Sequence, residues 1–79
     1  MAFDYRKLKG KIIEIYGNHY SFAKAMGWSE RTLSLKLNGK RVWTQKDICK
    51  AAELLGIPES DIQTYFFKIK VQTIELQNV

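Results

Sequence analysis

Apolar residues recur at helical spacing along most of the chain. The first predicted helix runs from a capping Asp4 to about Tyr16, and Gly17 is placed to end it. Its buried stripe is expected to consist of Tyr5, Leu8, Ile12, Ile15 and Tyr16. This spacing predicts a helix with one face turned to a core.

Two shorter helices are predicted next, with three residues between them. Asn18 and Ser29 are good N-caps, and Gly27 opens the turn that separates the two helices. The apolar face of the first is Phe22, Ala23 and Met26. A short glycine-containing turn between two helices is the layout of a helix-turn-helix.

The stretch from residue 33 to 37 alternates apolar and polar residues, which is typical of a half-buried strand. Its ends favour a helix instead, because Ser29 caps one end and Asn38-Gly39 closes the other. On a helix, Leu33 and Leu37 share a buried face. Leu35 then points about 200° away from Leu33 and faces outward.

A fourth helix is predicted from the capping pair Thr44 and Asp47 to Gly56. Its apolar positions are Ile48, Ala51, Ala52 and Leu55. A short fifth helix is predicted from Pro58 to about Tyr65, because proline suits a first helical turn.

Beyond residue 66 the pattern changes to strict alternation, with Phe67, Ile69 and Val71 on one face. This pattern predicts a strand. An unpaired strand edge needs a cover, and the same strand of a second copy is the simplest one. The alternative is that the tail folds back on its own helices, chiefly the first. The expected organisation is residues 1–66 as the helical domain and residues 67–79 as a dimerising tail.

Composition narrows the classes of function. The 79 residues suit one small domain, and a formal net charge of +5 favours polyanionic partners. A single cysteine excludes an internal disulfide, and with one histidine it excludes a structural zinc site. No leader, membrane-length apolar run, phosphate loop or catalytic constellation is apparent. We therefore expect a cytoplasmic, non-enzymatic protein without a cofactor, a membrane association or a small-molecule substrate.

Three motifs carry a resemblance to the Cro/cI-type helix-turn-helix regulators: FAKAMG at 22–27, SERTLSLKLNGK at 29–40 and LLGI at 54–57. FDYRKLKGKI at the start and YFF followed by K-x-K-V near the end are similar to small repressor-like proteins of phages and prophages of Gram-positive bacteria. One departure is His19, where the family often has a glutamine that touches DNA.

The resemblance implies a mainly α, five-helix, lambda-repressor-like DNA-binding domain followed by a C-terminal β-strand. It places DNA base contacts at Glu30, Arg31, Ser34 and Leu35. It places phosphate contacts at Asn18, His19, Lys36, Asn38, Lys40 and Arg41. The implied function is a homodimeric transcriptional regulator on a palindromic double-stranded operator. The alternative is a protein-binding module of the same fold, of an antirepressor or antitoxin-like kind, which Glu30 and Leu35 would suit.

Overall fold

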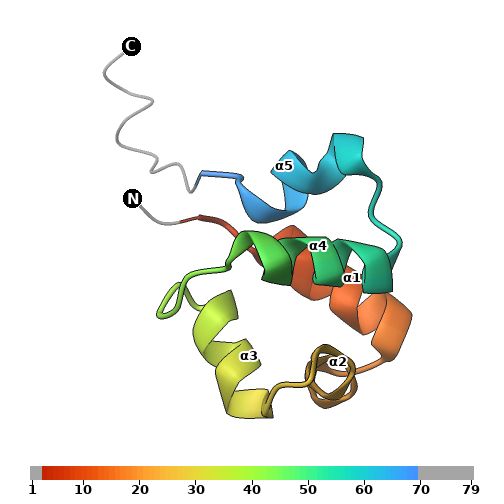
Figure 1. Cartoon of the computed structure of the whole chain (residues 1–79), viewed down its shortest axis with the longest axis vertical. Coiled ribbons are helices and arrows are strands. Elements are labelled where there is room, and N and C mark those ends of the chain that lie inside the picture. The colour runs from red at the N-terminus through yellow and green to blue at the C-terminus, as the bar shows by residue number, and fades with distance from the viewer. Residues whose placement is uncertain (1–2, 70–79) are drawn as a thin grey trace.

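The computed structural model describes residues 3–69, which form five α-helices and one short 3-10 helix. The elements are α1 (Arg6–Tyr16), α2 (His19–Met26), α3 (Glu30–Leu37), α4 (Gln45–Leu55), the 3-10 helix η1 (Glu59–Asp61) and α5 (Ile62–Phe66). In Figure 1, α1 and α4 form the middle of the molecule, α2 and α3 lie on one side of them and α5 on the other. The five predicted helices are confirmed, with the start of the fifth wound as a 3-10 turn.

The predicted caps hold the ends of the helices except at the start of α1, where Tyr5 and not Asp4 is the N-cap and makes no side-chain capping bond; Asp4 Oδ1 instead accepts from the Arg6 N–H at 3.0 Å. Asn18 Oδ1 accepts a hydrogen bond from the Ser21 N–H at 2.7 Å, at the start of α2. The Thr44–Asp47 capping box is complete, with both reciprocal hydrogen bonds present. Gly17 takes the left-handed conformation (φ 83°) that ends α1.

One hydrophobic core lies between the helices. Its buried members are Tyr5, Leu8, Ile12, Phe22, Ala23, Met26, Leu33, Leu37, Trp43, Ile48, Ala51, Ala52, Leu55, Ile57 and Phe66. Ile15, expected in the buried stripe of α1, is instead 48% exposed. Ile15 lies only about 20° around the helix axis from Leu8, so its exposure follows from its place in the last turn of α1, where Tyr16 is the residue that packs against the core.

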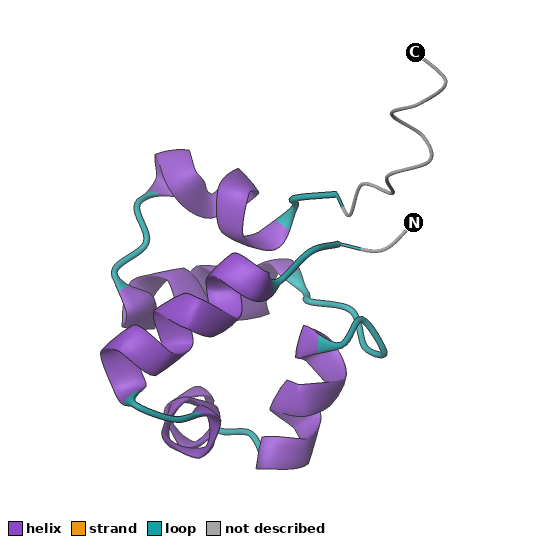
Figure 2. Cartoon of the chain, turned by 180° about the vertical axis from the view of Figure 1, so that it is seen from behind, coloured by secondary structure: helices purple, strands orange, loops and turns teal. Residues whose placement is uncertain are grey.

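The predicted C-terminal strand is wrong over its described part. Phe67 terminates α5, and Ile69 forms only an isolated antiparallel bridge with Phe3. Figure 2 accordingly shows helices and loops only for residues 3–69. Phe66 explains the difference: it is 1% exposed, so core packing continues α5 up to the point where the strand was expected to start. Val71 lies outside the described residues.

Candidate functional site

A three-residue turn joins α2 to α3. Gly27 ends α2 in the left-handed conformation (φ 82°), and Ser29 Oγ accepts a hydrogen bond from the Thr32 N–H at 3.2 Å. In Figure 1, α2 is seen end-on and α3 from the side, so the two axes point in very different directions. The two caps therefore fix where α3 starts and how it leaves α2.

The outer face of α3 carries three of the four residues expected to read bases, and the fourth, Glu30, lies at the leading end of the helix. Glu30, Arg31 and Ser34 are exposed, and Leu35 is half-buried. Leu33 and Leu37 point the other way, with 0% and 4% of their surfaces exposed. The inward side of α3 is therefore as predicted. Arg31, Ser34 and Leu35 lie on the other side, whereas Glu30 is about 60° around the axis from Leu33.

The loop from residue 38 to 44, which we call the α3–α4 loop, extends this face. The side chains of Asn38, Lys40 and Arg41 are exposed, as expected for phosphate contacts. The backbone N–H groups of Lys40 and Arg41 are engaged, because both donate to the carbonyl of Leu35, at 2.8 and 3.2 Å. The loop therefore offers the side chains of these two cations, and not their backbone N–H groups, to a partner.

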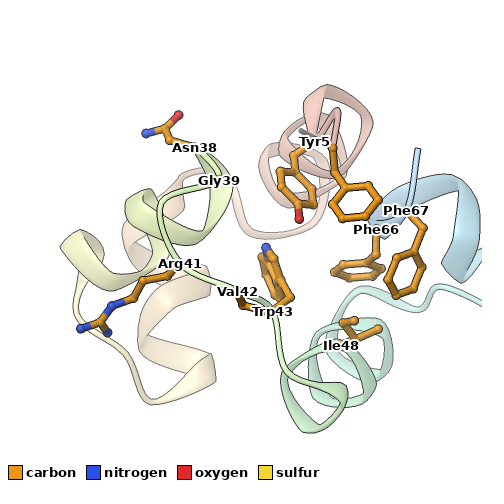
Figure 3. Close-up of a pocket in the computed structure, with 10 residues that line it drawn as sticks. Tyr5, Asn38, Gly39, Arg41, Val42, Trp43, Ile48, Phe66 and Phe67 are labelled. Carbon is orange, nitrogen blue, oxygen red and sulfur yellow. The ribbon is translucent and has the colours of Figure 1, made fainter. Parts of the chain in front are cut away.

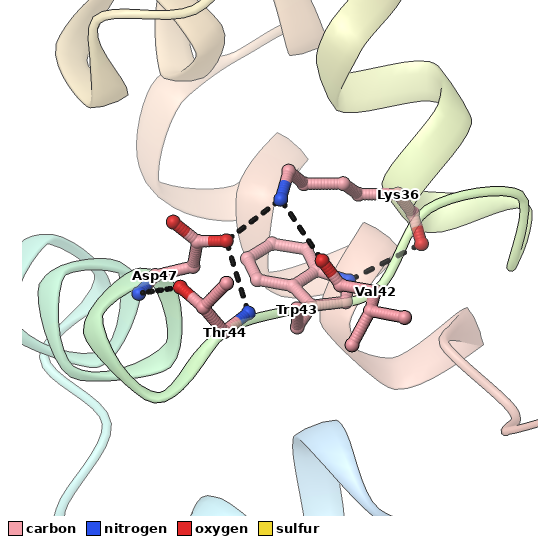
Figure 4. A network of polar contacts seen from close by, with 5 residues as sticks. All are labelled: Lys36, Val42, Trp43, Thr44 and Asp47. Carbon is pink, nitrogen blue, oxygen red and sulfur yellow. Dashed lines mark hydrogen bonds and ion pairs between the residues drawn. The ribbon is translucent and has the colours of Figure 1, made fainter.

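Lys36 is a correction to the sequence prediction. It was expected on the exposed flank of α3, yet it is 8% exposed. Its ammonium donates to Asp47 Oδ2 at 2.7 Å and to the Val42 carbonyl at 3.0 Å (Figure 4). It also lies 4.8 Å from the centre of the Trp28 ring. Because its charge and its hydrogen bonds are taken up inside the protein, Lys36 is not available as a phosphate contact.

The electrostatics of this pair depend on Asp47. Burial of its carboxylate raises the pKa, but hydrogen bonds from the Lys36 ammonium and the Thr44 N–H outweigh this effect and hold the pKa below its ordinary value. Asp47 is therefore ionised at neutral pH. It neutralises Lys36, and the positive charge next to α3 comes from Arg31, Lys40 and Arg41.

The start of α2 carries the remaining two expected contacts. Asn18 is exposed and His19 is half-buried. The side chain of Asn18 is used in its capping bond to Ser21. Both residues lie at the positive end of a helix dipole, which suits a nearby anion.

An aromatic groove lies beside the α3–α4 loop, and the sequence analysis did not foresee it. It has a volume of about 310 Å³ (Figure 3). Its lining consists of Phe3, Tyr5, Asn38, Gly39, Arg41, Val42, Trp43, Ile48, Phe66 and Phe67. Trp43 has a packing role in this groove, because it is 7% exposed and its ring centre lies 5.2 Å from that of Phe66. The feature of the sequence that could have predicted this groove is the number of aromatic residues near the two ends of the helical part.

Other kinds of site find no support in the part of the chain that the structure describes. There, no three His, Cys, Asp or Glu side chains are grouped so that they could hold a metal ion. Cys49 is exposed and is not in a disulfide. Among residues 3–69, no helix is both long and apolar enough to cross a membrane.

Comparisons with known proteins bear on the family. The family described as "Protein of unknown function (DUF739)" matches residues 1–69. The solution structure of the modulator of repression (MOR) of the temperate bacteriophage TP901-1 from Lactococcus lactis is 51% identical, with a TM-score of 0.76. That match covers 91% of this chain and 97% of the other. No curated protein matches. The chain therefore belongs to the DUF739 family.

Proposed function

We propose that this protein is a phage or prophage regulator that acts on repression through the outer face of α3. The observation that carries the proposal is the 51% identity, over almost the full length of both chains, to a phage modulator of repression. The arrangement of α3 supports the choice of surface, because Arg31 and Ser34 are exposed on it beside two further cations in the α3–α4 loop.

Duplex DNA is the partner that the geometry favours. In a lambda-repressor-like helix-turn-helix domain, the helix after the turn enters the major groove. Arg31 would then pair with guanine O6 and N7, and Glu30 would accept from cytosine N4. Ser34 suits either kind of base edge, and Leu35 suits a thymine methyl. Lys40 and Arg41, with Asn38 from the same loop and Asn18 and His19 from the start of α2, would contact the phosphates.

We further propose a homodimer on a palindromic operator. Phe67 and Ile69 support it, because both are apolar and about half exposed at the end of the described chain. Val71 continues their alternation in the sequence. Half-sites would lie about one helical turn, roughly 34 Å, apart. Such a regulator acts in the cytoplasm and needs neither a cofactor nor a catalytic residue.

A protein partner is the second candidate, and two observations favour it. Asp47 neutralises Lys36, which lowers the positive charge beside α3, and Glu30 exposes a negative charge at the leading end of that helix. The related phage protein is named for modulating repression. The partner would be the repressor itself, with a basic group on it opposite Glu30 and an apolar one against Leu35.

Selection of bound sequences from a random duplex pool tests the first candidate. Enrichment of a two-fold symmetric site supports DNA recognition. Failure to enrich any sequence, together with release of the repressor from its own operator when this protein is added, supports the second candidate. Glu30→Lys is a sharp companion variant: it should tighten binding to random duplex DNA while losing the preference for cytosine, but it should weaken binding to a basic group on a protein partner.

A further inference from the structure

Lys36 lies in the last turn of α3 and connects this helix to two other parts of the chain. Its ammonium reaches Val42 in the α3–α4 loop and Asp47 in the first turn of α4. Asp47 Oδ2 also accepts from the Thr44 N–H at 3.0 Å, which ties the same carboxylate to the end of the loop. One ammonium group thus joins the end of α3, the loop and the start of α4 (Figure 4).

Burying an ammonium group costs free energy, because the group loses its hydration. Its desolvation must be offset by good geometry, and an apolar side chain of similar size often serves stability as well or better. Unlike an apolar side chain, an ammonium group has three N–H donors, and these require hydrogen-bond partners at definite positions. Here those positions are a carboxylate, a carbonyl and the face of Trp28. The energetics therefore indicate a role in holding a particular arrangement.

The arrangement that Lys36 holds is that of the α3–α4 loop. The indole N–H of Trp43 donates to the Lys36 carbonyl at 3.2 Å, and the Gly39 N–H donates to it at 3.3 Å. These two bonds are made by the backbone carbonyl, which any residue at this position would supply, and the lysine side chain adds the bond to the Val42 carbonyl near the end of the loop. Lys40 and Arg41 lie between these attachment points.

We propose that Lys36 is a positioning residue that fixes the α3–α4 loop against α3, so that Lys40 and Arg41 meet the same partner as Arg31. The part of this proposal that concerns a partner rests on the proposed function. The part that concerns the loop does not, and the two can be tested separately.

Amide hydrogen exchange of Lys36→Met tests the loop. Methionine keeps the length of the side chain and removes its charge and its donors. The amides of Lys40 and Arg41, which bond to Leu35, should exchange about tenfold faster than in the native protein. The Leu33 amide, earlier in α3, should stay within about twofold. Lys46→Met, which removes an equally charged but exposed lysine at the start of α4, should leave all of these amides unchanged.

A double-mutant cycle tests the link to binding, with a mixed-sequence DNA duplex as the probe. Lys36→Met combined with Asp47→Asn, which removes the ion pair without changing the net charge, should weaken binding by about fivefold in the native background. It should have no effect when Lys40 and Arg41 are already alanine, because Lys36 acts through them. An equal loss in both backgrounds would mean that Lys36 contacts the probe directly, which would overturn the proposal.

Exchange that accelerates equally in all helices, or not at all at Lys40 and Arg41, would also overturn the proposal. If Lys36→Met does not fold, Asp47→Asn takes its place, because it removes the ion pair and leaves the Lys36 bond to Val42. It should loosen the same two amides by a smaller factor. If the protein binds no DNA, the proposed DNA interface fails, whereas the exchange result still decides whether Lys36 positions the loop.

Discussion

Phe3, which precedes α1, and Ile69, which follows α5, form an isolated antiparallel β-bridge. Next to it, the Asp4 N–H donates to the Lys68 carbonyl at 2.6 Å, and the rings of Phe3 and Phe67 meet edge to face with centroids 5.8 Å apart. The first residues of the tail therefore have a partner in their own chain. The bridge nevertheless leaves Phe3, Phe67 and Ile69 between 40% and 48% exposed, which is apolar surface that a second copy can cover.

We predict that the full-length protein is a dimer at about tens of micromolar, the ordinary range for weak self-association. Replacing Phe67 and Ile69 together by serine should make it a monomer, as measured by sedimentation equilibrium. The matched control is serine at Ile13 and Ile15, which are each 48% exposed on α1 and should not change the mass. A native protein that sediments as a monomer would contradict the prediction. Truncation before Phe66 is not a usable test, because this residue is buried in the core.

Binding to duplex DNA should depend strongly on salt. Each phosphate neutralised by a lysine or arginine contributes about 0.9 to the slope of log affinity against log salt concentration. Lys40→Ala and Arg41→Ala should each make the slope shallower by about one and weaken specific and random DNA about equally. Filter binding over a range of salt concentrations measures both quantities. An affinity for duplex DNA that does not change with salt would argue against the DNA interface.

The Lys36–Asp47 pair should make stability depend on pH in the acid range. The pKa of Asp47 is lower in the folded protein than in the unfolded chain, so its contribution is fully present above the unfolded value of about 3.9. That contribution is lost as the pH falls through the lower folded value. Denaturation midpoints from pH 7 down to about 2 should therefore fall less steeply for Asp47→Asn than for the native protein.

The pKa of Asp4 is also lowered in the folded protein, so Asp4 serves as a comparison. Hydrogen bonds from the side chain and backbone N–H of Arg6 hold its pKa well below the ordinary value. The denaturation midpoint of Asp4→Asn should therefore also fall less steeply with decreasing pH than that of the native protein. The double variant should be flatter than either single one, because the two pairs lie in different parts of the chain. Identical pH profiles for Asp47→Asn and the native protein would show that the Lys36 pair adds nothing to stability.

The helices could be predicted from the sequence because the residues that start and end them lie within a few positions of each helix end. The caps Asn18, Ser29 and Thr44 and the glycine ends act within a few residues, so the sequence reports them directly. The errors concern long-range packing. Nothing near Lys36 in the sequence reveals that Asp47 would meet it across a loop, and the alternation after Phe67 carries no information on a pairing with Phe3. Burial of charge and strand pairing depend on the assembled core, which a pattern of neighbours does not describe.

Leu35 provides the sharpest test of the α3 face. It is half-buried and outside the core, whereas Leu33, two residues earlier, is fully buried. Leu35→Ala should therefore cost less than about 1 kcal/mol of the free energy of unfolding. Leu33→Ala, the matched control, should cost about 2–5 kcal/mol. Chemical denaturation of the two variants checks this difference, and a cost for Leu35→Ala as large as for Leu33→Ala would mean that Leu35 belongs to the core.

The same leucine tests direct reading of a base. If Leu35 contacts a thymine methyl in the operator, Leu35→Ala should weaken specific binding by about 1 kcal/mol. Replacing that thymine by uracil, which lacks only the methyl group, should cost the native protein a similar amount and the variant almost nothing. Titration against operators with single uracil replacements measures this coupling. Equal losses for native protein and variant at every position would show that Leu35 reads no methyl group, and the outer face of α3 would then fit the protein partner better.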